Sequence, residues 1–133
     1  MYRFSKKEDY AFILIAKLTQ NYKKRLISLS EIAKEYNISP LFLRNLANNL
    51  RNNKIIGAIE GAKGGYFLLK NPKKIKVGEI LNSLSSKALF ECCSSRTCPR
   101  EKICPAGFSW RKINKEFLDK IYNLSFTEFI NKK

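Results

Sequence analysis

All four cysteines of this chain lie between positions 92 and 104, and they are the side chains best suited to chemistry. Cys92, Cys98 and Cys104 are evenly spaced, with five residues between neighbours, and Cys93 is the fourth. Three thiolates on one loop can converge on a metal ion or cluster. The chain contains no histidine, so it lacks the usual general base and the usual nitrogen ligand for a metal. We therefore predict a metal or redox centre and do not predict an enzyme.

The spacing of the thiols bears on which centre they would hold. A structural zinc ion normally takes four nitrogen or sulfur ligands, often from paired C-x-x-C turns. No C-x-x-C motif is present, and a site using every thiol would need the adjacent Cys92 and Cys93 as ligands. Three thiolates completed by a ligand other than cysteine suit an iron–sulfur cluster, of two or four irons. A zinc site and a buried structural cysteine cluster are the alternatives.

The charge balance indicates the kind of partner. Lysine and arginine total 26 against 11 acidic residues, which gives a formal net charge of +15. Such an excess favours a polyanion, either nucleic acid or an anionic membrane surface. The N-terminus is charged at positions 6–9, unlike a signal peptide, and apolar stretches such as Phe12–Ala16 are too short to cross a bilayer. We expect a cytoplasmic protein that does not use the membrane, in a compartment that keeps thiols reduced.

Two short capped helices are predicted to form a helix-turn-helix. Ser28 with Glu31 has the form of a capping box, and it begins a helix that ends near Asn37. Ser39–Pro40 begins the next helix, because serine accepts a hydrogen bond from a free amide and proline sits where no amide is needed. Capped helices separated by about three residues are typical of a helix-turn-helix. The residues of the first helix expected to face inward are Ile32, Ala33 and Tyr36.

The second of these helices carries an outward face suited to DNA bases. The helix contains no acidic residue between Pro40 and Lys54. Asparagine and arginine bind base edges in two places at once, and apolar groups contact the thymine methyl. An ordinary solvated face is the alternative. The residues expected to face the core are Leu43, Leu46, Ala47 and Leu50. The predicted DNA-binding residues are Ser39, Leu41, Phe42, Arg44, Asn45, Asn48 and Arg51.

A β-hairpin placed directly after the helix-turn-helix would be a wing. Two apolar runs, Ile55–Ile59 and Tyr66–Leu69, flank the glycine-rich segment 60–65. The glycines permit a tight turn and would let Lys63 approach a phosphate or the minor groove. Other basic residues are predicted to add phosphate contacts, so binding should weaken steeply with salt. These residues are Lys6, Lys7, Lys23, Lys24 and Arg25.

The C-terminal part is predicted to contain a dimerisation helix. Apolar residues recur there at spacings of three and four, which suits pairing with a second copy of the helix. The predicted dimer interface consists of Trp110, Ile113, Phe117, Ile121 and Leu124. Further helices are expected from Ser5 to about Gln20, from Lys76 to Leu84, and after a capping box of Ser125 with Glu128.

These elements predict a mainly α protein with a small β wing. Residues 1–84 would form a winged helix-turn-helix DNA-binding domain, and residues 85–107 a cysteine loop that binds the cluster. Residues 108–133 would form the long dimerisation helix and a short C-terminal helix.

Several motifs together resemble the Rrf-type winged-helix transcription regulators, which include IscR-like and NsrR-like members. The resemblance covers nearly the whole chain. The motifs are Ser5-Lys6 before Asp9-Tyr10-Ala11, Leu29–Ala33, Ile38–Leu43, Gly61–Gly65 followed by Tyr66, Val77–Ile80, the evenly spaced cysteines, Trp110, and Leu124–Phe129. The resemblance implies that Cys92, Cys98 and Cys104 are cluster ligands. It also implies that the long helix is the dimer interface, with the cluster near the partner's N-terminal helix.

The chain departs from this pattern at two places. The IscR-like pattern has a histidine ligand three residues after the last cysteine, where this chain has Gly107. The wing of the family usually begins with Arg-Gly, where this chain has Glu60-Gly61. In NsrR-like members an aspartate of the first helix reaches the cluster across the dimer, and Asp9 occupies the matching place. A solvated Asp9, with Glu8, Cys93 or an exogenous group as the ligand, is the alternative.

The sequence thus predicts a homodimer that binds an operator in double-stranded DNA. It would be a repressor that senses redox state, nitric oxide or iron–sulfur status through its cluster. A zinc-based or thiol-based regulator with the same DNA role is the first alternative. An iron–sulfur electron-transfer protein is the second, and no nucleotide motif or acid–base pair supports it.

Overall fold

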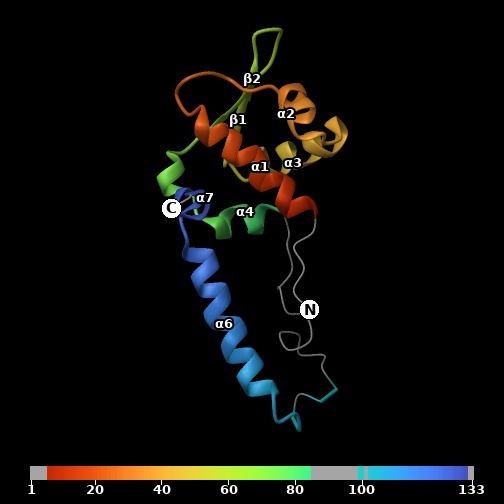
Figure 1. Cartoon of the computed structure of the whole chain (residues 1–133), viewed down its shortest axis with the longest axis vertical. Helices are drawn as coiled ribbons and strands as arrows, with labels where there is room; N and C mark the ends of the chain where they lie inside the picture. Colours follow the sequence, from red (N-terminus) through yellow and green to blue (C-terminus); the bar gives the residue numbers. More distant parts are fainter. Residues whose placement is uncertain (1–5, 85–98, 101, 132–133) are drawn as a thin grey trace.

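The structure is a computed structural model that describes residues 6–84, 99–100 and 102–131. Its elements are α1 (Lys6–Gln20), α2 (Leu29–Tyr36), α3 (Pro40–Asn52), β1 (Ile56–Ile59), β2 (Gly65–Leu68), the 3₁₀ turn η1 (Pro72–Lys74), α4 (Val77–Ser83), α6 (Gly107–Asn123) and α7 (Phe126–Ile130). Figure 1 shows one body built from α1–α4, the hairpin and α7, from which α6 projects. The prediction of a mainly α protein with a small β wing is confirmed.

The helix-turn-helix is held by local hydrogen bonds at the helix ends. The hydroxyls of Ser28 and Ser39 each accept a bond from the backbone N–H three residues later, at 3.2 and 3.4 Å. Between the helices Asn37 adopts a left-handed conformation with φ 53°, which ends α2 and turns the chain. Pro40 occupies the first position of α3, as its missing N–H requires. The capped helix pair is therefore present as predicted.

The wing is a two-stranded antiparallel hairpin. Its register pairs Ile56 with Leu68 at the base and Ile59 with Gly65 near the tip. The turn needs glycine at position 64, because a Cβ there would lie 1.9 Å from the carbonyl oxygen of Ile59. Ile27, between α1 and α2, bridges to β2 through two hydrogen bonds with Tyr66, of 2.8 and 3.1 Å. Strand β2 of the wing is thus tied to the helical body.

The C-terminal helix α7 packs into the core of the N-terminal body. Phe126 is fully buried, and its N–H donates to the Ile75 carbonyl at 2.7 Å. The Val77 N–H donates to the Leu124 carbonyl at 2.9 Å, so α4 begins beside the end of α6. The two helices approach closely because residue 78 is glycine: a Cβ there would lie 2.6 Å from the Tyr122 ring. Residues from both ends of the chain therefore build one core.

Two details of the sequence interpretation need correction or fall outside the structure. Tyr36 is 41% exposed rather than inward-facing, because α2 has only two turns and buries only Ile32 and Ala33. Ser5, the expected cap of α1, lies outside the described residues. In the described part of the chain, no helix combines the length and the apolar character that crossing a bilayer requires.

Candidate nucleic-acid interface and cysteine site

The outward face of α3 is exposed along its whole length. The inward residues Leu43, Leu46, Ala47 and Leu50 are at most 2% exposed. Every predicted DNA-binding residue of this helix and its cap is exposed: Ser39, Leu41, Phe42, Arg44, Asn45, Asn48 and Arg51. Leu41 is 65% exposed. The helix thus presents asparagine, arginine and one exposed leucine, which are side chains that suit contacts with base edges in the major groove.

Phe42 has a packing role that the sequence did not indicate. Its ring meets the ring of Tyr10 on α1 edge to face, with centroids 5.5 Å apart and an interplanar angle of 84°. It remains 37% exposed. Such aromatic pairs add stability beyond the area they bury. Phe42 therefore fixes the start of α3 against α1 while one side of its ring stays accessible.

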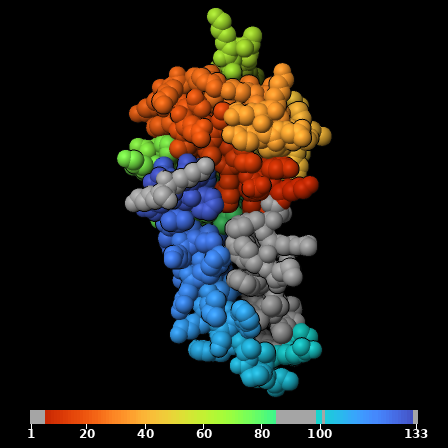
Figure 2. Space-filling view, in the orientation of Figure 1, coloured from red at the N-terminus to blue at the C-terminus, as the bar shows by residue number. Residues whose placement is uncertain are grey.

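A shallow groove joins α3 to the wing. It has a volume of about 340 Å³ and is lined by Arg44 and Arg51 of α3, by Ser30 of α2 and by wing residues 58–61. The hairpin tip, which carries the exposed Lys63, stands out from the body in Figure 2. Within the described part of the chain the ion pairs join other residues, so Arg44, Arg51 and Lys63 keep their charges unpaired. Two arginines face one carboxylate, Glu60, in the groove, so it carries a net positive charge of the kind that suits a DNA backbone.

Two ion pairs attach α2 to the elements before it. Lys17 of α1 contacts Glu35 at 2.7 Å, and Arg25 binds Glu31 through both guanidinium nitrogens at 2.6 and 3.0 Å. The hydrogen bonds from Arg25 lower the pKa of Glu31 below its ordinary value of 4.5. In the other ion pair, the hydrogen bond to Glu35 raises the pKa of Lys17 above its ordinary value. Since α2 packs on α3, these pairs help to set the angle of the recognition helix.

Two of the five basic residues expected to contact phosphate are engaged elsewhere. Lys7 is partly buried, and its ammonium donates to the Leu84 carbonyl at the end of α4, at 2.5 Å. This bond caps the last turn of α4, where a positive charge is favoured. Arg25 is held by Glu31. Lys6, Lys23 and Lys24 are exposed.

Only one of the expected cluster ligands from the cysteine loop lies in the described residues. Cys104 is a half-buried free thiol just before α6, whereas Cys92, Cys93 and Cys98 lie outside the description. A Cβ built at Gly107 would lie 3.6 Å from the Cβ of Cys104, so a side chain there would stand beside the thiol. The guanidinium of Arg111 lies beside the same position, 3.4 Å from that Cβ. The described residues contain no group of three potential metal ligands.

The side of α6 that carries Gly107 also buries a polar group. Asn114, two turns further along, is 6% exposed, and its Oδ1 accepts no hydrogen bond within the described residues. Gly107 and Asn114 are the two buried residues of this helix. A buried amide oxygen without a donor is costly. Near this end of α6, the thiol of Cys104 is the cysteine donor that the described residues offer to a bound group.

Asp9, the expected ligand from α1, is exposed on the body. Cys104 lies at the far end of α6, which Figure 1 shows projecting away from α1. Glu8, the alternative carboxylate, is 8% exposed and engaged by a partner.

The expected dimer interface is exposed at one end of α6 and covered at the other. Trp110 and Ile113 are 50% and 49% exposed, whereas Phe117, Ile121 and Leu124 are half-buried. The sequence interpretation missed two exposed apolar residues nearby, Ile103 at 81% and Phe108 at 71%. They fall outside the three-and-four spacing that selected the others. The projecting half of α6 thus carries apolar surface that the chain itself does not cover.

Comparisons with known proteins agree with this architecture. The chain is 26% identical over 132 residues to the HTH-type transcriptional regulator IscR of Pectobacterium atrosepticum. The match covers 98% of this chain and 80% of that protein. The oxidized form of Staphylococcus aureus CymR superposes with a TM-score of 0.78 at 28% identity, over 98% of both chains. IscR of T. potens shares the fold, with a TM-score of 0.75 at 24% identity over 96% of this chain and 85% of that one.

The family assignment rests on the extent of the sequence match. The profile of the Rrf2 family, described as iron-dependent transcriptional regulators, matches residues 4–132. That range includes the capped helix pair, the wing, the cysteines and α6. The chain belongs to the Rrf2 family, and it is a DNA-binding winged-helix transcription regulator rather than an enzyme.

Proposed function

We propose that the protein represses transcription as a homodimer that places α3 in the major groove and senses its signal through an iron–sulfur cluster. The main support for this way of binding DNA is the outward face of α3. This face is exposed, contains no acidic residue and is continuous with the arginine-lined groove at the wing. The proposed activity places the protein in the cytoplasm, with its DNA.

Each predicted DNA-binding residue of α3 and its cap has a role that follows from its chemistry. Asn45 and Asn48 present amides that can pair with an adenine edge. Arg44 and Arg51 line the groove, where a guanidinium can bind guanine or phosphate. Ser39 can bind phosphate, while Leu41 and the free side of Phe42 can meet a thymine methyl. Lys63 at the wing tip would contact the backbone or minor groove.

DNA recognition is tested by selecting duplexes from a random library with the wild-type protein and then measuring binding by fluorescence anisotropy. Asn48→Ala should bind the selected duplex roughly tenfold or more weakly, because a bidentate base contact contributes about 1–3 kcal/mol of discrimination. Its binding to random duplexes should stay unchanged. Asn82→Ala is the matched control, since Asn82 is an exposed asparagine on α4. If no duplex is enriched, or if both variants bind alike, the proposed mode is wrong.

The dimer is proposed from the uncovered apolar surface of α6. Burying the half-exposed Trp110 and Ile113 against a second copy would remove that surface from water. Ile113→Asp should therefore shift the protein from dimer to monomer in sedimentation equilibrium. Lys112→Asp introduces the same carboxylate at a neighbouring exposed position outside the interface, and it should leave the dimer intact. A wild-type protein that sediments as a monomer would contradict the proposal.

The cluster site is proposed from the donor set. Cys92, Cys98 and Cys104 would hold the cluster, and the partner's Asp9 would complete the ligands where Gly107 offers no side chain. When bound, a cluster of this kind supplies sensitivity to oxidation and to nitric oxide. The residues of the chain would hold it at the projecting end of α6, next to the proposed dimer interface.

The metal is identified by iron, sulfide and zinc analysis and an absorption spectrum of protein purified without oxygen. Iron and sulfide in equal amounts are expected in the wild type and in Cys93→Ser. Cys104→Ser should lose most of both, and Asp9→Ala should retain the cluster less well. Zinc in place of iron would establish the zinc-based alternative, while a metal-free protein that still switches on thiol oxidation would establish the thiol-based one.

The sensing step is tested separately from DNA binding itself. The cluster-loaded and cluster-free proteins should differ in affinity for the selected duplex, because half-sites lie about one DNA turn apart and a small shift between the two α3 helices misaligns one of them. Equal affinities would refute sensing and leave DNA binding standing. Electron transfer without any duplex affinity would favour the electron-carrier alternative.

A further inference from the structure

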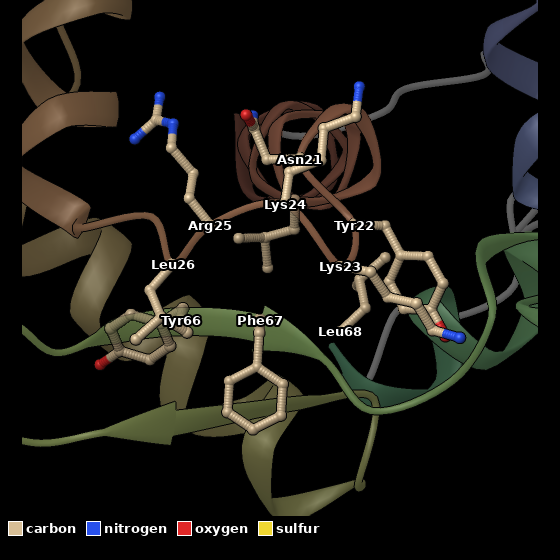
Figure 3. Close-up of a pocket in the computed structure, with 10 residues that line it drawn as sticks. Asn21, Tyr22, Lys23, Lys24, Arg25, Leu26, Tyr66, Phe67 and Leu68 are labelled. Carbon is tan, nitrogen blue, oxygen red and sulfur yellow. The ribbon is translucent and has the colours of Figure 1, made fainter.

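A cavity lies beside the wing, apart from the groove that faces α3. Its volume is about 370 Å³, and it opens between the last turn of α1, the connection to α2, and β2. Figure 3 shows Asn21 and Lys24 on one side of it, with Tyr66, Phe67 and Leu68 of β2 across from them. This volume falls within the range of small-molecule sites in proteins, about 300–1,000 Å³.

The lining combines an apolar wall with a cationic rim. The wall is formed by Leu18, Tyr22, Leu26, Tyr66 and Leu68, and the rim by Asn21 and the run Lys23–Arg25. Phe67 also borders the cavity, but its ring points to the other side of β2 (Figure 3). No acidic residue lines the cavity. The Arg25 charge is taken by Glu31, but Lys24 has no ion-pair partner in the described part of the chain. The charge that an occupant would meet is therefore positive.

The cavity is formed by an ordered backbone. The N–H groups of Lys24 and Arg25 donate to the Asn21 carbonyl at 3.0 and 3.3 Å, and two hydrogen bonds tie Ile27 to Tyr66. Lys23 adopts φ 59°, a left-handed conformation that a lysine rarely takes. The backbone of the rim is thus held by a fixed turn, so this side of the cavity is formed before a ligand arrives.

We propose that this cavity binds a small organic anion with a flat apolar body, of the aromatic sulfonate or carboxylate class. The body would lie against Leu18, Leu26 and Leu68, and the anionic group would be met by the ammonium of Lys24, an exposed rim side chain that would turn toward the ligand from its direction in Figure 3. A DNA phosphate could satisfy the charge, but a phosphodiester brings no apolar group to cover the wall. Arg44 and Arg51, the arginines of the DNA groove, do not line the cavity, although Tyr66 borders both sites.

The site is tested by two-dimensional NMR of the ¹⁵N-labelled protein titrated with naphthalene-2-sulfonate. Saturable shifts are expected at the amides of residues 18–26 and 66–68. Two matched probes separate the parts of the ligand: naphthalene-2-methanol has the body without the charge, and methanesulfonate has the charge without the body. Both should bind much more weakly. The protein alone is used, so failure here leaves the DNA-binding proposal untouched.

Two variants with the same charge change locate the anionic group. Lys24→Glu should weaken naphthalene-2-sulfonate binding about tenfold, because it replaces an attraction by a repulsion at the rim. Lys73→Glu, at an exposed lysine of η1 outside the cavity, should bind as the wild type does. Leu26→Ala should weaken binding through the apolar wall and leave the charge in place. Shifts that map to α6, methanesulfonate binding as tightly as the full probe, or equal affinities of the two lysine variants would each overturn the proposal.

Discussion

Among single residues, Arg25 shows how an exposed side chain can act on the recognition helix from a distance. It donates two hydrogen bonds to Glu31 in the first turn of α2, and α2 packs against α3. Sequence analysis assigned Arg25 to a phosphate contact because the run Lys23–Arg25 reads as uniform positive charge. The structure distinguishes two of these residues. Arg25 forms an ion pair with Glu31, whereas Lys24 lines a cavity and has no ion-pair partner among the described residues. Spacing alone cannot reveal which member of a charged run meets a carboxylate.

The Arg25–Glu31 pair gives a pH-dependent prediction. The pKa of Glu31 is lower in the folded protein, so the pair adds stability above pH 4.5 and loses it as the pH falls through the lowered pKa. Arg25→Ala should thus be slightly less stable than the wild type at neutral pH and equally stable in acid. Urea unfolding followed by circular dichroism at both pH values measures the difference. Lys73→Ala should match the wild type at each pH, and a deficit of Arg25→Ala that grows in acid would contradict the assignment.

At the scale of elements, the wing depends on a glycine that makes its turn. A Cβ at position 64 would collide with the Ile59 carbonyl oxygen, so Gly64→Ala must open the hairpin tip that carries Lys63. We expect weaker DNA binding with an unchanged NMR spectrum for the helical core, since Ile56 and Leu68 are buried at the hairpin base. Ala62→Ser changes an exposed residue of the same turn and should have no effect. Equal affinities of both variants would show that the tip does not contact DNA.

The elements that sequence analysis predicted well are those fixed by local chemistry. The caps at Ser28, Ser39 and Ser125 each bind an amide within three residues, so their signal lies in a short window of sequence. The hairpin follows in the same way from the glycines between two apolar runs. Tyr36 was misplaced because an eight-residue helix is too short for its apolar periodicity to decide which side is buried. The 3₁₀ turn η1 was not predicted, although Asn71–Pro72 marks its start.

For the whole molecule, the placement of α7 is the feature that sequence periodicity could not provide. Nothing near Phe126 in the sequence indicates that it fills the core of a body formed by residues 6–84. The same holds for the bond from Lys7 to Leu84, which joins residues 77 positions apart. The cavity beside β2 is likewise a product of tertiary packing. The α3 face was predictable because one helix supplies all of it, whereas three segments assemble the cavity.

The core position of Phe126 predicts a large effect on stability. Phe126→Ala should reduce the free energy of unfolding by about 3–5 kcal/mol, the usual cost of a buried phenylalanine cavity. Phe129→Ala is the matched control on the same helix, because Phe129 is 45% exposed and should cost much less. Urea unfolding of both variants measures the difference. Similar losses for the two would mean that α7 is docked by its exposed rings rather than by Phe126.

This arrangement also bears on how the protein is made. Synthesis begins at the N-terminus, so α3 and the wing emerge from the ribosome long before the residue that completes their core. Until Phe126 follows, the DNA-reading segments have an open core and are exposed to proteases. A chain cut short before α7 would be degraded rather than occupy an operator. Competence to bind DNA is thereby reserved for chains translated through α7.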